Sequence, residues 1–151
     1  MNLTDSLYLV GKEFVTILKD LQEGLGIIDV FDGDQQFIPN YPAACVETGS
    51  KARELTATGL RTDIAFTVYV MLYYSLIADN QIVRSEAMKL AEKLEHAFHM
   101  SYETVNGLVV HGHFIEIVPG YTQRQNGLTH VVRLTWAGIS KTRLQDVTTG
   151  P

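Results

Sequence analysis

The chain has 151 residues, a single cysteine and a formal net charge of −5 at pH 7. Its 46% hydrophobic and 19% charged residues are typical of a globular protein rather than a disordered one. The acidic balance argues against a dedicated nucleic-acid binder, and one cysteine excludes an intramolecular disulfide. We therefore expect one domain over residues 1–140 and a C-terminal tail over residues 141–151.

No stretch of the sequence resembles a targeting or membrane segment. The start of the chain, Met-Asn-Leu-Thr-Asp-Ser, lacks the basic and apolar regions of a signal peptide. No apolar run reaches the roughly 18 residues that a membrane span needs. We therefore expect no membrane partner and a protein that is made in the cytoplasm.

The first predicted element is an amphipathic helix. Apolar residues recur at three- and four-residue steps from Leu3 to Leu21, which places them on one helix face. Asn2 and Thr4 are candidate N-caps, and the glycines that follow the stripe, Gly24 and Gly26, end the helix.

Two short strands are predicted next. Ile27 to Phe31 is apolar and β-branched, and the Asp32-Gly33-Asp34 sequence that follows it is typical of a turn. A second strand, Ala43 to Thr48, begins after Pro42, since the missing N–H of proline is tolerated at the start of a strand. The polar segment from Gly49 to Gly59 is expected to be a loop, with or without a short helical turn.

The clearest β pattern runs from Thr62 to Leu76. One face carries only large apolar or aromatic side chains and should pack on helices: Ile64, Phe66, Val68, Val70, Leu72 and Tyr74. The other face is mixed and contains Tyr69, Met71 and Tyr73. Either a loop of the chain itself covers this second face, or it contacts a partner, because Tyr and Met are enriched at protein interfaces.

The last predicted elements are a helix over residues 80–99 and two strands over residues 108–118 and 128–137, separated by a loop. The helix has an apolar stripe made by Val83, Ala87, Leu90, Ala91, Leu94 and Phe98. If Val118 pairs with Leu128, then Glu116 faces His130. Together the elements predict an α+β fold, a mostly antiparallel sheet with two amphipathic helices packed on one face.

Few residues suggest chemistry. His111, His113, His130 and Glu116 are the best metal-ligand candidates, but the predicted pairing splits them between two sheet faces, so we predict no metal site. Cys45 lies in an apolar strand and is predicted to be a small buried residue rather than a nucleophile. The carboxylates around Gly33 (Asp29, Asp32, Asp34) lack the closing Glu of a calcium loop and favour a turn. We predict no cofactor and no catalytic residue.

Basic side chains gather in two predicted loops. Lys51, Arg53 and Arg61 precede the long strand, and Arg124 lies near the end of the chain, followed by Lys141 and Arg143. Such side chains are usually solvated, but they could also contact an acidic neighbouring subunit or DNA phosphates. Our candidate surface for contacts with other subunits consists of Tyr69, Met71, Tyr73, Lys51, Arg53, Arg61 and Arg124.

The order of these elements resembles that of the tail terminator, or tail completion, proteins of tailed bacteriophages. The segment Tyr41-Pro42-Ala43-Ala44-Cys45-Val46-Glu47-Thr48-Gly49 is similar to the Pro-initiated strand of that family, and the long strand, second helix and closing strand pair follow it. The resemblance covers residues 1–140. It implies a structural protein of the virion rather than an enzyme, one that forms a ring, usually of six subunits, assembled in the host cytoplasm.

The resemblance also implies partners. Such a ring caps the tail tube protein, stops tube growth and offers a joining surface to head–tail connector or neck proteins, while DNA passes through its lumen without specific binding. Two alternatives stay open. One is a neck, head-completion or other minor tail protein of the same fold. The other is a small cytoplasmic enzyme or ligand-binding protein, in which one of the three histidines (His111, His113 or His130) converges with a carboxylate in a pocket.

Overall fold

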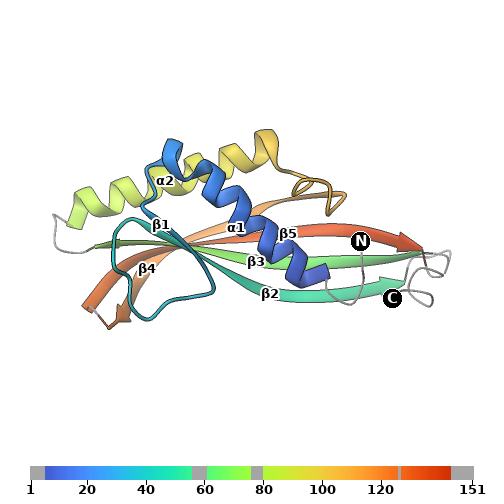
Figure 1. Cartoon of the computed structure of the whole chain (residues 1–151), viewed down its shortest axis with the longest axis horizontal. Helices are drawn as coiled ribbons and strands as arrows, with labels where there is room; N and C mark the ends of the chain where they lie inside the picture. Colours follow the sequence, from blue (N-terminus) through green and yellow to red (C-terminus); the bar gives the residue numbers. More distant parts are fainter. Residues whose placement is uncertain (1–5, 56–60, 76–79, 126, 144–151) are drawn as a thin grey trace.

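The described residues form a five-stranded sheet with two helices on one of its faces (Figure 1). The computed structural model describes residues 6–55, 61–75, 80–125 and 127–143. Its elements are α1 (Ser6–Leu25), β1 (Asp29–Asp32), β2 (Ala43–Leu55), β3 (Arg61–Ser75), α2 (Asn80–Ser101), β4 (His111–Arg124) and β5 (Gly127–Arg143). The strand order is β1-β2-β3-β5-β4, in which β1 and β2 are parallel and every other pair is antiparallel. The predicted α+β fold is therefore confirmed.

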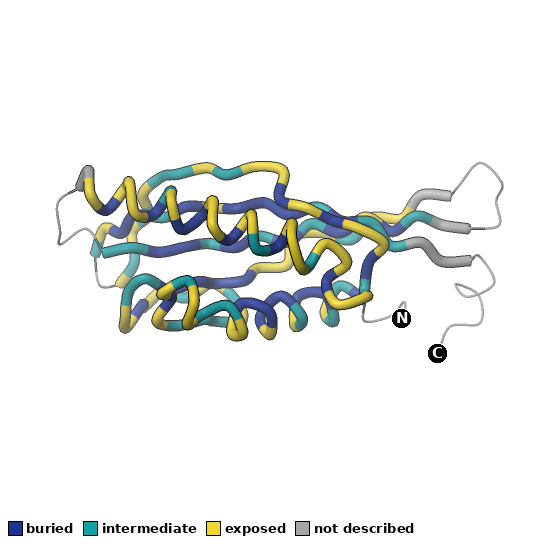
Figure 2. The backbone as a smooth tube through the Cα atoms, turned by 90° about the horizontal axis from the view of Figure 1, so that it is seen from above, coloured by how far each residue is buried: buried dark blue, intermediate teal, exposed yellow. Residues whose placement is uncertain are grey.

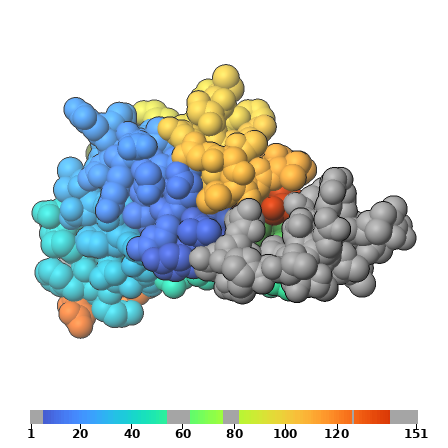
Figure 3. Space-filling model, turned by 45° about the vertical axis from the view of Figure 1, so that its right-hand side comes forward, coloured from blue at the N-terminus to red at the C-terminus, as the bar shows by residue number. Residues whose placement is uncertain are grey.

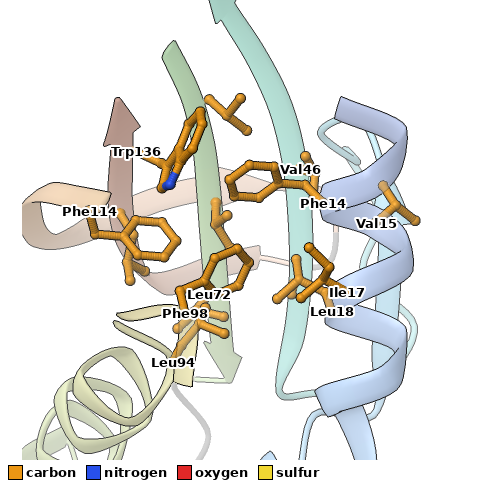
Figure 4. Close-up of a cluster of buried hydrophobic side chains, with 14 of the residues drawn as sticks. Phe14, Val15, Ile17, Leu18, Val46, Leu72, Leu94, Phe98, Phe114 and Trp136 are labelled. Atoms are coloured by element: carbon orange, nitrogen blue, oxygen red, sulfur yellow. The ribbon is translucent and has the colours of Figure 1, made fainter. Parts of the chain in front are cut away.

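Both helices pack their predicted apolar stripes against the sheet. Along α1 and α2 the buried positions alternate with exposed ones at helical spacing (Figure 2). Phe14 of α1 and Phe98 of α2 stack with ring centroids 5.1 Å apart, and Phe14 also meets Trp136 of β5 edge-on at 5.0 Å. In Figure 4 these side chains point toward one another from both helices and the sheet. No helix in the described part of the chain is long and apolar enough to cross a membrane.

Two glycines make room for the largest buried side chain. Trp136 is fully buried, and its indole ring lies over Gly112 of β4 and Gly138 of β5. A Cβ atom at either glycine would come within 2.1 Å of the ring. Because side chains on one sheet face repeat every two residues, only a residue without Cβ fits beside Trp136 at these positions.

Three strands are longer than the sequence predicts. β2 does not end at Thr48 but continues to Leu55 past a bulge at Gly49, so the expected loop over residues 49–59 is wrong for its described first half. β4 runs through Pro119 and Gly120 to Arg124, where a loop was expected. β5 reaches Arg143, so the first three residues assigned to the tail belong to the sheet; the other tail residues lie outside the described ones.

These extensions have a common physical cause. Backbone pairing does not need apolar side chains, so a polar segment continues a strand when a neighbour offers the matching donors and acceptors. Beyond α1 and α2 the ends of β2, β3 and β5 run on together as a three-stranded arm (Figure 1). Pro119 is tolerated in β4 because β4 is an edge strand, where one side makes no ladder hydrogen bonds.

The predicted register of the closing hairpin is wrong by several residues. Val118 pairs with Arg133 instead of Leu128, and Tyr121, not Glu116, is the partner of His130. β4 extends to Arg124, which pairs with Gly127, and this moves the whole pairing along β5.

The segment after α2 packs beside α1. Val105 and Val109 of this segment are buried, and Asn106 Nδ2 donates a hydrogen bond to Glu13 Oε1 at 2.6 Å. Figure 3 shows the segment (orange) adjoining α1 (blue) on the surface. The candidate N-caps of α1, Asn2 and Thr4, lie outside the described residues.

Candidate functional site: the helix-free face of the sheet

The strand alternation divides β3 as predicted. Its apolar face (Ile64, Phe66, Val68, Val70 and Leu72) lies in the main core under the helices. Tyr69, Met71 and Tyr73 point to the opposite, helix-free face, and they share it with the residues that they pair with in β5, Thr135, Arg133 and Val131. The expected division of β3 between a helix face and a second, mixed face is confirmed.

The loop between β1 and β2 covers one end of this second face. Ile38 of the loop forms a small separate core with Ala43, Cys45 and Tyr73. Met71 and Val131 pack at its margin, together with Phe31 and Tyr41. Tyr73 is only 1% exposed, so its assignment to an accessible contact surface is wrong. Met71 is half-buried against the same core.

A partly buried ion pair fastens this loop to the sheet. Arg124 Nη2 of β4 lies 2.9 Å from Asp34 Oδ2 of the loop and also donates to Tyr73 Oη. Tyr73 Oη donates to Asp34 Oδ1 at 2.5 Å. Burial, together with the hydrogen bond to Asp34, raises the pKa of Tyr73 above its ordinary value, so its hydroxyl stays protonated and can donate. The Arg124 side chain is 10% exposed, and it is therefore a part of the loop attachment rather than of an open basic patch.

Cys45 lies under the same loop and is fully buried. Burial raises the pKa of its thiol to about 12. Since the thiolate is the reactive form, such a thiol is a poor nucleophile at neutral pH. It packs as a small buried side chain in the separate core that it forms with Ile38, Ala43 and Tyr73.

The middle of the helix-free face is accessible in the part of the chain that the structure describes. There the guanidinium of Arg133 lies 5.5 Å from the centroid of the Tyr69 ring and 3.8 Å from Glu116 Oε1. Apolar side chains of β4 adjoin these residues: Val118, the pairing partner of Arg133, is 38% exposed, and Ile115, at the bulge, is 58% exposed. Tyr69 is half-buried, so this surface offers an aromatic ring, two opposite charges and exposed aliphatic carbon.

The predicted basic cluster is placed on the arm. Lys51 and Arg53 belong to β2, where Lys51 is half-buried and Arg53 is exposed. Arg61 is the first residue of β3 and its backbone pairs with Arg143, but its side chain lies outside the described residues. Strand pairing, not a loop, therefore sets the spacing of these cations.

The three histidines of the sequence prediction do not meet. His111 and His113 are exposed on edge strand β4, on the face opposite the helices. His130 is 1% exposed, on the helix side, and burial followed by the charge of Arg84 lowers its pKa. Within the described residues, no three His, Cys, Asp or Glu side chains are arranged to hold a metal ion.

The carboxylates near Gly33 also diverge. Asp32 lies 3.0 Å from Lys12 Nζ of α1, whereas Asp34 turns toward Arg124. Asp29 accepts a hydrogen bond from Asn40. Gly33 has a φ of 96°, as the turn interpretation of this sequence requires.

One cluster was missed by the sequence reading. An open groove of about 390 Å³ lies between α2 and β4 and is lined by Glu95, His96, His99, Glu103, His113 and Phe114. His99 Nδ1 lies 3.0 Å from Glu103 Oε1. His96 and His99 are three residues apart and lie on one side of α2, and this spacing could have indicated part of the groove; Glu103 follows after the helix ends at Ser101. His113 lies at the outer edge of the sheet and therefore also borders this groove and its carboxylates, although its register position belongs to the helix-free face; His111 and His130 do not line the groove.

No family model matches the chain, and no curated protein matches its sequence.

Proposed function

We propose that this protein is a structural component of a phage virion, a tail terminator that assembles into a ring, caps the tail tube and provides the head–tail joining surface. The observation that carries the proposal is that the helix-free face of the sheet is only partly covered. This face is sealed at one end by the loop that contains Ile38, whereas no described residue covers the region of Tyr69, Arg133 and Val118. A sheet face with a partly exposed aromatic ring and exposed aliphatic groups next to paired charges is suited to a protein partner.

The element order supports the same proposal. A helix, a strand entered through Pro42, a long strand, a second helix and a closing strand pair occur in the order of the family layout. The long arm of β2, β3 and β5 adds a second surface. A closed ring needs two different patches that meet between neighbours, and one chain with an open face and a projecting arm can supply them.

The net charge of −5 fits a ring through which DNA moves. Tight contact with DNA arises mainly from Lys and Arg on phosphate, so an acidic ring would let DNA pass without holding it. The expected partners are other copies of the chain, six in the usual ring, tail tube protein and the connector or neck proteins of the head.

The test is electron microscopy of the purified full chain, alone and after mixing with tail tube protein of the same virus. We expect closed rings, or density that caps one end of each tube, together with shorter tubes as the protein concentration rises. Tubes of unchanged length with bare ends, and a chain that stays monomeric at every concentration, would refute the proposal. Binding to head connectors without binding to tubes would instead identify a neck protein.

A further inference from the structure

Two opposite edges of the sheet are open in the described structure. β1 pairs only with residues 43–46 of β2, so the remainder of β2 forms one edge of the arm. β4 is the edge strand on the other side. An assembly that joins these two edges is head-to-tail, because each subunit then uses two different surfaces.

The β2 edge carries positive charge on the helix side of the sheet. Arg53 pairs with Ile64, whose side chain lies in the main core under the helices, and paired residues in an antiparallel ladder share a face. Lys51 pairs with Phe66 of the same core and therefore points to the same side. Arg53 is exposed and stands where a neighbouring molecule can reach it.

The β4 edge carries negative charge on that same side. The groove between α2 and β4 contains the carboxylates of Glu95 and Glu103, and both of these residues are exposed. Phe114 forms part of its lining and is itself packed in the helix-side core. A guanidinium on an aliphatic stem matches such a groove, since it can pair with carboxylates while its stem lies against an aromatic ring.

We propose that the β2 edge of one copy docks into the α2–β4 groove of the next copy, with Arg53 placed between Glu95 and Glu103. This inference rests on the ring assembly proposed above and names the surfaces that build it. Both patches lie on the helix side and at opposite sheet edges, so repeated docking keeps the helix layers of all subunits on one side of the ring. The occupant of the groove is a second copy of this chain.

A cross-linking experiment tests the contact directly. Arg53→Cys and Glu103→Cys are combined in one full-length chain, assembled with and without tubes, and treated with a short bis-maleimide. Docking predicts a ladder of covalent oligomers that stops at the ring size. Each single variant should give no ladder, because a head-to-tail contact does not bring identical positions together. The matched control combines Arg53→Cys with Lys89→Cys, an exposed position of α2 that does not line the groove. The native Cys45 is buried and should not react.

Charge reversal gives an independent readout. Arg53→Glu and Glu103→Arg should each weaken self-association at least tenfold, and the combined variant should recover most of the loss. If the wild-type chain forms rings but the double-cysteine chain gives no ladder and the reversals leave ring mass unchanged, this docking is wrong while the ring stands. If the wild-type chain stays monomeric with and without tubes, both proposals are overturned.

Discussion

The attachment of the loop over the sheet gives the sharpest stability prediction. Asp34→Ala removes the acceptor of two interactions at once, the ion pair with Arg124 and the hydrogen bond from Tyr73. Breaking a buried ion pair costs about 3–5 kcal/mol, because the remaining charge loses its partner. Here Asp34 keeps 33% of its side chain exposed, so water can solvate part of the site. We therefore expect a loss of about 2–3 kcal/mol in the free energy of unfolding.

Asp32, in the same Asp32-Gly33-Asp34 turn, provides the matched control. Asp32 lies two residues earlier and forms an ion pair of similar length, 3.0 Å, with Lys12, but both side chains are about half exposed. Exposed ion pairs contribute roughly 0–1 kcal/mol, so Asp32→Ala should change stability by less than about 1 kcal/mol. Asp34→Asn keeps an acceptor for Tyr73 and should fall between the two alanine variants.

Two assays check this prediction. Urea denaturation gives the free energy of unfolding for each variant, with an unchanged slope as the sign of two-state behaviour. Reaction of Cys45 with a thiol reagent in native buffer reports opening of the loop that covers it, and it should be faster in Asp34→Ala than in Asp32→Ala. Equal effects of the two alanine substitutions in both assays would refute the role given to burial of the ion pair.

Three further changes follow from the described contacts. Gly138→Ala puts a Cβ 2.1 Å from the buried Trp136 ring and should cost about 1–3 kcal/mol in urea denaturation; Gly120→Ala, with no neighbour within 4 Å, should stay within roughly 0.5 kcal/mol. The folded-state pKa of Cys45, about 12, exceeds its ordinary value of 9.0, so its contribution to stability is present below pH 9.0 and is lost above it. In Cys45→Ala the free energy of unfolding should therefore fall less steeply with pH between pH 9.0 and about 12 than in the wild-type chain; an unchanged slope of that free energy against pH contradicts this. Tyr69→Asp should leave the chain folded by circular dichroism yet reduce binding to tubes or to other copies, because the charge would be desolvated at the contact; unchanged ring mass would show that this face is not used.

The burial of Tyr73 changes what its substitution can test. On a free surface, Tyr73→Asp would be expected to affect assembly alone. At 1% exposure, with its hydroxyl bonded to Asp34, the introduced charge would be placed in the second core and should unfold the loop region. Tyr69, four residues before the covered Tyr73, is the residue that separates assembly from folding.

The helices and the long strand could be predicted from the sequence because their signals are local. The α2 stripe from Val83 to Phe98 and the alternation from Ile64 to Leu72 each repeat with the period of one element, and a single buried face suffices to produce that pattern. The same alternation showed that β3 has a second, mixed face. The two-helix, one-sheet fold class follows from these elements, since one stripe and one apolar face must be buried against each other.

Only the tertiary structure decided those features that need contact between residues far apart in the sequence. The polar ends of β2 and β5 become strands only because β3 lies between them to pair with their backbones. Asp34 and Arg124 are 39 and 51 residues from Tyr73, and nothing local marks that the three side chains meet. Whether an aromatic strand face is buried by the chain's own loop or left for a partner depends on how the chain returns over the sheet. Local periodicity carries no information about that path, so only the packed structure separates the buried Tyr73 from the half-buried Tyr69.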